Sequence, residues 1–548
     1  MDVDLLLRNA NVITVDRDRP RASVIAVSAG RIVAVGDESL ADLSAASVLD
    51  LGGLTVVPGF NDAHQHMAHH GAALAQVPLS SPPVRTVEDI LDRIAERVDA
   101  TPPGEWVIGA GYDQNKLLEG RHPTASELDR VAPDHPVLLG HNSGHMCVVN
   151  GAAMRLARVG DRPVPDGGRV VLDDDGRPTG LLQEQAQELV RELIRPSSIA
   201  AVVEALGLAS DQYLSEGVTS CQEAGVGCGS VGQTPIELAA YQEARTAGRL
   251  RVRVTAMVAQ ENLHDIGRHA SDPAGRHIDL GIRTGFGDEW LRVGPTKVFA
   301  DGSLIGRTAA MFEPFEGGDD PGFFQIEPRE LAEIITGAHL AGWQVATHAI
   351  GDRAVSTVLD IYEACQRDNP RPDARHRIEH AGVTRADDVA RMARLGVIPV
   401  PQARFISEIG DGMKAALGPR RTRDCYRQRS FLDAGLPLPG SSDRPVVQGA
   451  PLLGIHDLVN QRTEAGEPFN PDEALTPEQA IEAYTLGSAY AAFDEGRKGS
   501  ICTGKLADLV VLTADPTATD PAAVAEIDVL ATIVGGSIAY EAEGSLGA

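Results

Sequence analysis

Hydrophobic and polar positions alternate with a period of two at both ends of the chain. The N-terminal runs VDLLLRNANVITV and SVIAVSAGRIVAVGD are broken by Ala-Gly and Gly-Asp steps, a pattern typical of short β-strands joined by turns. The C-terminal runs SICTGKLADLVVLTAD and VLATIVGGSIAYEAEG repeat this pattern. We therefore expect residues 1–56 and 497–548 to form one composite β-sandwich.

Between these ends, short apolar runs alternate with stretches of helical periodicity, which indicates parallel βα units. Eight apolar runs follow one another, and they begin at Leu54, Gly217, Leu250, Leu291, Trp343, Arg375, Gly396 and Gly435. Eight units in this order predict an α/β fold in which residues 57–496 form a (β/α)8 TIM barrel. The last run, GLPLPGSSD, is the weakest strand candidate because it contains two prolines.

The stretch from about residue 70 to 210 lies between the first and second apolar runs. It is too long for a single βα connection, which is typically a few residues on each side of one helix. The stretch contains the helical run VEDILDRIAERVDA and the hairpin-like run RVVLDDDGRPTGLL. We expect an insertion after the first barrel strand, positioned over the barrel mouth.

Two histidines, His64 and His66, stand one residue apart just after the apolar run LTVVPGF. If residues 54–60 form a buried strand, side chains two apart at its end point the same way. Two neutral imidazoles held close together are natural metal ligands. A hydrogen-bonded surface pair at a strand end is the alternative, and these two residues alone do not decide between them.

Further ionisable residues occupy the other barrel strands. Lys297 lies in the fourth run, His348 in the fifth, His380 in the sixth, and Asp443 at the end of the eighth. Barrel enzymes keep their sites at the carboxyl ends of the strands, so these side chains should converge with His64 and His66. Lys297 lies in the apolar run VGPTKVFA, where an amine is costly unless it is paired, neutral or modified. A buried ion pair with Asp301 and a side chain reaching out to solvent are the alternatives.

The net charge and the N-terminal residues narrow the partners and the location that we expect for this protein. The 548 residues include 49 basic and 77 acidic side chains, for a formal net charge of −28, without a block of Lys or Arg. Nucleic acid and anionic membranes are therefore poor partners. The N-terminus lacks the bases of a signal peptide, and no uninterrupted apolar run reaches the roughly 18 residues that span a bilayer. We expect a cytoplasmic protein with a small-molecule substrate. A homodimer is one possible assembly.

The motifs GFNDAHQH, SGHMCVVN, KVFADGSLIGRTA, THAIGDRA, HRIEHA, GSSDRPV and GKLADLVVL extend over nearly the whole chain. With them the sequence resembles the metal-dependent amidohydrolase superfamily, and within it the YtcJ-like (amidohydrolase 3) branch that includes N-substituted formamide deformylases. The resemblance implies two divalent ions, with Zn as the first expectation and Fe, Mn or Co as alternatives. The implied metal ligands are His64, His66, Lys297, His348, His380 and Asp443.

Within this set the resemblance assigns separate roles. His64, His66 and Asp443 would bind the more buried ion, and His348 and His380 the second. Lys297 matches a lysine that relatives carboxylate with CO2, and the resulting carbamate would bridge both ions.

The implied activity is hydrolysis of an amide C–N bond, other than a peptide bond, in a small N-formyl or N-acyl amine. Asp443 would act as general base and acid. Opening of a cyclic amide and hydrolytic deamination are alternatives, and a non-catalytic metal-binding regulatory protein is a rival of another class. The remaining candidates are less specific: His145 for the oxyanion or a structural turn, Arg307 for a substrate carboxylate or a surface ion pair, and Glu184 and Gln402 for the pocket wall.

Overall fold

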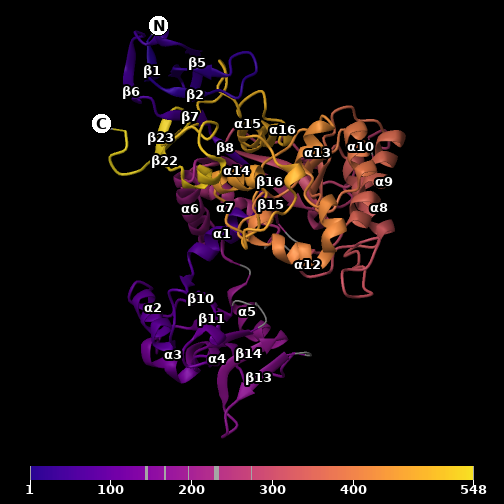
Figure 1. Cartoon of the computed structure of the whole chain (residues 1–548). Coiled ribbons are helices and arrows are strands. Elements are labelled where there is room, and N and C mark those ends of the chain that lie inside the picture. Colours follow the sequence, from indigo (N-terminus) through magenta and orange to yellow (C-terminus); the bar gives the residue numbers. More distant parts are fainter. Residues whose placement is uncertain are drawn as a thin grey trace. The chain divides into compact units, whose positions relative to one another are not determined.

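Strands from the two ends of the chain pair in one sheet (Figure 1). The computed structural model describes residues 2–141, 146–165, 168–195, 197–227, 232, 234–272 and 274–546. One sheet has the order β5-β4-β1-β6 and the other the order β23-β22-β21-β7-β2-β3. Their strands are β1 (Val3–Arg8), β2 (Asn11–Ile13), β3 (Arg21–Ala22), β4 (Val24–Ser28), β5 (Arg31–Gly36), β6 (Ala45–Asp50), β7 (Thr55–Pro58), β21 (Leu509–Leu512), β22 (Val529–Val534) and β23 (Ser537–Glu541).

Alternating side chains of both sheets share one hydrophobic core, as the period-two pattern predicts. Leu5 and Leu7 of β1 meet Val56 of β7 and Val511 of β21 in this core. The composite sandwich is therefore confirmed.

Within the described part of the chain, the barrel sheet contains seven parallel strands in the order β20-β19-β18-β17-β16-β15-β8. The strands are β8 (Phe60–Gln65), β15 (Val218–Val226), β16 (Arg253–Ala259), β17 (Leu291–Phe299), β18 (Val345–Ala349), β19 (Arg377–His380) and β20 (Ile398–Val400). A nearly closed parallel sheet with helices between its strands confirms the TIM-like α/β barrel.

The prediction of an eighth strand was wrong, because residues 435–443 form no strand ladder. Pro437 and Pro439 carry no N–H group, which explains the missing ladder. The segment still closes the gap between the two ends of the sheet, β8 and β20. Ala63 N–H of β8 donates to Gly440 O at 2.9 Å, and Ala403 N–H, just after β20, donates to Ser441 O at 3.3 Å.

The first apolar run also differs from its prediction. Residues 55–58 belong to β7 of the sandwich, and the first barrel strand is the following segment, β8. Gly59 separates the two strands, and a Cβ at this position would lie 2.2 Å from Thr219 Oγ1. The close approach of β15 therefore requires glycine at the point where the chain passes from the sandwich to the barrel.

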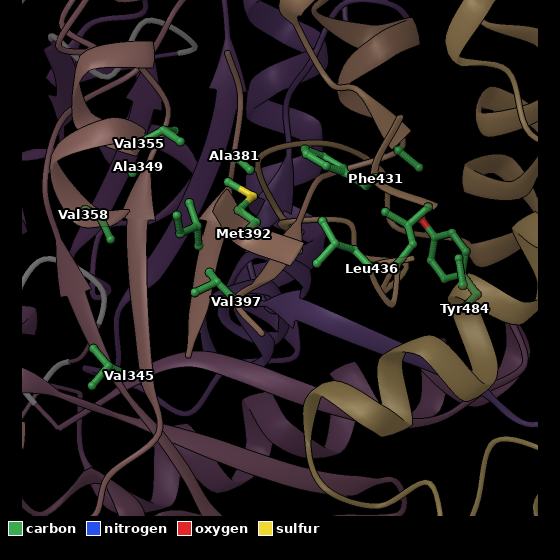
Figure 2. Close-up of a cluster of buried hydrophobic side chains, with 14 of the residues drawn as sticks. Val345, Ala349, Val355, Val358, Ala381, Met392, Val397, Phe431, Leu436 and Tyr484 are labelled. Atoms are coloured by element: carbon green, nitrogen blue, oxygen red, sulfur yellow. The ribbon is translucent and has the colours of Figure 1, made fainter. Parts of the chain in front are cut away.

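Helices cover the barrel strands and bury their apolar faces against them. α9 buries Val355, Val358 and Leu359 at the three- and four-residue spacing of an amphipathic helix, in the same core as Val345 and Ala349 of β18 (Figure 2). The helices of this region are α6 (Ile199–Ser215), α7 (Glu237–Thr246), α8 (Pro328–Leu340), α9 (Asp352–Asp368), α10 (Ala386–Leu395), α11 (Phe405–Glu408), α12 (Gly410–Arg421), α13 (Gln428–Asp433), α14 (Pro451–Asn460), α15 (Pro477–Glu482) and α16 (Ser488–Ala491).

Residues 69–208 form a compact unit of their own, whereas residues 1–68 and 209–548 form the other. The smaller unit has a sheet in the order β13-β14-β12-β11-β10-β9. Thr86 and Thr124 each close a capping box at the start of a helix. The elements are α1 (Met67–Leu74), β9 (Val77–Pro78), α2 (Val87–Asp99), β10 (Val107–Tyr112), α3 (Ala125–Val131), β11 (Val137–His141), β12 (Met146–Val149), α4 (Gly151–Ala157), β13 (Gly168–Leu172), β14 (Pro178–Glu184) and α5 (Glu188–Ile194).

Within the described residues, no single helix has the length and apolar character needed to cross a membrane, although one bent pair, 185–194 with 199–215, meets both criteria together.

Candidate metal centre

The polar strand β8 is buried along its whole length and begins the site. Buried polar groups are costly unless they are hydrogen-bonded, and the partners of β8 come from distant segments. Asp62 accepts a hydrogen bond of 2.5 Å from Ser442 Oγ, and Gln65 accepts one from the Tyr213 hydroxyl. His64 Nδ1 is hydrogen-bonded to Glu379. These contacts fix the strand that presents His64 and, just beyond it, His66.

His64, His66 and Asp443 converge on one point. The Oδ1 atom of Asp443 lies 3.1 Å from His66 Nε2 and 3.4 Å from His64 Nε2. One ligand atom from each residue lies within 4.8 Å of the others, and all three side chains are buried. This spacing suits one ion shared by three side chains.

Lys297, His348 and His380 join this cluster from neighbouring strands. Lys297 Nζ lies 3.5 Å from His64 Nε2. The ring of His380 lies 5.0 Å from that of His64 and 4.4 Å from that of His348, measured between centroids. The structure therefore brings together all six residues that the sequence places at the strand ends.

Two members of the cluster have strained backbone conformations. His380 has φ of 72° and Asp443 has φ of 62°, in the left-handed region that non-glycine residues rarely adopt. Glu379 faces the barrel interior, so regular alternation would direct His380 away from it, and the positive φ turns its ring back toward the cluster. The cost of such a conformation is about 1–3 kcal/mol per residue, and strain of this kind gathers at functional sites.

Three histidines of the cluster, His66, His348 and His380, are held neutral by burial. Burial lowers the pKa of His66, lowers that of His348 to about 3, and holds that of His380 well below its usual range. His348 Nε2 donates to Gly302 O at 2.9 Å, and His380 Nδ1 lies 2.7 Å from Gln402 Oε1. Each of these two rings thus has one nitrogen engaged by an acceptor and the other available as a ligand.

Lys297 is buried and has no way out to solvent, because only 2% of its surface is exposed. Burial lowers its pKa to about 8, against the opposing charges of Glu379 and Asp443. Asp301, the alternative partner, instead accepts backbone N–H bonds from Ala310, Ile350 and Gly351. Among the described residues it forms no ion pair with Lys297. A neutral amine among imidazoles and a carboxylate is the form that can react with CO2.

Asp443 is ionised in this setting. Burial works to raise its pKa, but the neighbouring side chains of His64 and His66 outweigh burial and hold the pKa well below the usual range. Its N–H donates to His64 O at 2.7 Å, which fixes the segment against β8. Asp443 is therefore a charged acceptor beside the two imidazoles.

The less specific candidates are scattered. Gln402 is buried beneath His380 through the contact described above. Arg307 is exposed and donates to Glu316 O at 3.0 Å, and within the described residues no hydrogen bond joins it to the cluster. Glu184 is an exposed residue at the end of β14 in the smaller unit. His145 falls outside the described residues.

Three ionisable residues beside the cluster are not among the candidates that the sequence suggests. Glu223 lies in β15, and its Oε1 is 3.9 Å from His66 Nδ1. Burial raises the pKa of Glu223 to about 8. Arg377 and Glu379 lie in β19 and are completely buried. The signal for the last two was the pattern HRIEHA, in which two opposite charges alternate in a strand that the sequence predicts to be buried.

Comparisons with known proteins agree with this geometry. The model of the amidohydrolase family matches residues 47–540. The Bacillus subtilis (strain 168) protein YtcJ is 32% identical over 498 residues, 90% of each chain. An N-substituted formamide deformylase of Arthrobacter pascens is 33% identical over 555 residues, 99% of each chain. An uncharacterized metal-dependent hydrolase from Pyrococcus furiosus has a crystal structure with a TM-score of 0.75 and 29% identity, covering 94% of this chain and 99% of that one.

Proposed function

The chain belongs to the amidohydrolase family, and on that premise we propose that it is a metal-dependent hydrolase of the C–N bond in a small N-formyl or N-acyl amine. The observation that carries this proposal is the convergence of His64, His66 and Asp443 within 4.8 Å. The similarity to an N-substituted formamide deformylase supports the choice of bond.

The donor set fits divalent metal ions. Neutral imidazoles and an ionised carboxylate are ligands of Zn²⁺, and Fe, Mn and Co accept the same set. His64, His66 and Asp443 would hold one ion, and His348 and His380 a second. Lys297 lies within 3.5 Å of His64 Nε2. Its amine would attack CO2 to form an N–C bond and lose a proton, which gives a carbamate anion able to bridge the two sides.

A divalent ion held there would lower the pKa of water from about 15.7 to roughly 7 and polarise the substrate carbonyl. Asp443 supplies the proton transfers. Its carboxylate would accept the proton of the attacking water and then deliver it to the leaving nitrogen. The low pKa of Asp443 keeps it in the accepting form before the reaction begins.

A substrate panel tests the proposed reaction. The metal-loaded protein is assayed with N-formyl amines, N-acetyl amines, N-acyl amino acids and cyclic amides, and released amine and ammonia are measured separately. Release of an amine together with formate or a carboxylate is the expected result. Ammonia as the sole product would identify a deaminase, and ring opening without a released amine would identify a cyclic amidohydrolase.

The Asp443→Asn variant then separates an enzyme from a metal-binding regulator. Loss of the proton acceptor should lower the rate of hydrolysis at least 100-fold, because general acid–base catalysis contributes roughly 10²–10⁴-fold. Asp388→Asn is the control, because Asp388 is equally buried but lies in α10 and accepts from Ser356. A metal-loaded protein that converts no member of the panel would contradict the hydrolase proposal and favour a regulatory role.

A further inference from the structure

Two opposite charges, Arg377 and Glu379, are completely buried inside the barrel beside the metal centre. They are two residues apart in β19 and so share the face of the strand that points inward. Arg377 Nε lies 2.7 Å from Glu379 Oε1, and Arg377 Nη2 lies 2.9 Å from Glu379 Oε2. This two-pronged contact fixes the plane of the carboxylate.

The guanidinium of Arg377 also connects β19 to strands across the barrel interior. Nη1 donates to Gln222 Oε1 of β15, and Nη2 donates to Ala63 O of β8 at 2.8 Å. Ala63 is the residue directly before His64. The pair is therefore tied by hydrogen bonds to the strand that carries the first metal ligand.

Glu379 contacts His64 directly. Its Oε2 is hydrogen-bonded to His64 Nδ1, and both side chains are buried. A carboxylate facing a guanidinium is an acceptor only, so His64 Nδ1 must carry the hydrogen. In the neutral form of the ring, the form that binds a metal, the lone pair is then on Nε2, the atom that lies 3.4 Å from Asp443 Oδ1 and 3.5 Å from Lys297 Nζ.

We propose that Glu379, held by Arg377, is the residue that fixes the tautomer and ring orientation of His64 for metal binding. This inference rests on the proposed metal centre. Glu379 is a positioning residue, since it acts through its hydrogen bond to His64. Removal of such a partner typically lowers metal affinity by roughly 10–100-fold.

The nitrogen that faces away from the cluster meets a neutral oxygen in two other imidazoles. His380 has the amide oxygen of Gln402, and His348 has the carbonyl of Gly302. Glu223 stands 3.9 Å from His66, beyond hydrogen-bond distance. Because Glu379 is hydrogen-bonded to His64, its loss should weaken the ion on the His64 side while the ion on the His348 side is retained.

The test is a double-mutant cycle on metal affinity, measured by competition with a chelator using Zn²⁺ as the probe. Glu379→Gln should weaken one of the bound ions by roughly 10–100-fold. In a His64→Ala background the same substitution should have no further effect, because its influence passes through His64. Unchanged affinity, or an equal loss in both backgrounds, would overturn the proposal.

A matched control separates positioning from general damage. Arg253 and Asp508 form another buried two-pronged pair, with distances of 2.8 and 3.0 Å. Asp508→Asn should lower thermal stability while it leaves Zn²⁺ affinity unchanged, and a loss of affinity equal to that of Glu379→Gln would count against the proposal. If Glu379→Gln does not fold, the double variant Arg377→Gln, Glu379→Gln is used in its place, because it removes both buried charges together.

A second readout does not depend on metal. In metal-free protein with ¹⁵N-labelled histidine, the His64 signal, identified by its loss in His64→Ala, should show a protonated Nδ1 and an unprotonated Nε2. Glu379→Gln should give a mixture of tautomers, and an unchanged signal would overturn the proposal. Absence of Zn²⁺ binding in the wild type would contradict the proposed function alone, and the ¹⁵N spectra would then decide the role of Glu379.

Discussion

Carboxylation of Lys297 should depend on pH in a way that an ordinary lysine does not show. Only the neutral amine attacks CO2, and burial lowers the pKa of Lys297 to about 8. The neutral fraction is then about 0.09 at pH 7, about 0.5 at pH 8 and about 0.9 at pH 9. The rate of carbamate formation should rise about fivefold from pH 7 to pH 8 and less than twofold from pH 8 to pH 9. A lysine of ordinary pKa, about 10.4, would gain nearly tenfold at each step.

The assay follows incorporation of ¹³C into metal-free protein by NMR, at a fixed concentration of dissolved ¹³CO2. Metal-free protein is the appropriate state, because the pKa of Lys297 reflects its protein surroundings alone. Lys297→Met supplies the background, since methionine fills a similar volume without an amine. A tenfold rise at each step through pH 9 in the signal above that background, or a carbamate signal in Lys297→Met equal to that of the wild type, would contradict the prediction.

Two further predictions concern stability. Removal of metal by a chelator should lower the unfolding temperature, because an ion that binds only the folded state contributes about 4 kcal/mol at a thousand times its Kd; an unchanged midpoint in calorimetry would contradict this. Gly71→Ala should lower the free energy of unfolding by about 1–3 kcal/mol, since the new Cβ would lie 1.8 Å from the backbone oxygen of Ala205. Gly267→Ala, where the new Cβ meets nothing within 4 Å, is the control, and equal thermal shifts for both variants would contradict the packing argument.

The convergence of the candidate ligands could be predicted from the sequence because it depends on local rules. Side chains at the carboxyl ends of parallel strands meet at one face of a barrel, and His64 and His66 share one direction through the period of two. The position of His380 follows a different cause. Its φ of 72° is imposed by the surrounding structure, and no pattern in the sequence predicts it.

The errors have physical reasons of the same kind. The apolar run at residues 54–60 looked like a barrel strand, but the strand that enters the barrel is the polar β8. Its burial depends on partners such as Tyr213, Glu379 and Ser442, which lie far away in the sequence. The role of Gln402 was missed for this reason too, since its contact with His380 depends on the barrel having already formed.

The metal content of the protein decides whether the converging side chains form a metal centre. Protein purified without chelators and without added metal is analysed for elements and compared with the double variant His64→Ala, His66→Ala. We expect about two divalent ions per wild-type chain and fewer in the variant. About one ion in the wild type would retain the hydrolase and remove the bridged pair, whereas no ion, even after reconstitution with metal and bicarbonate, would contradict the account.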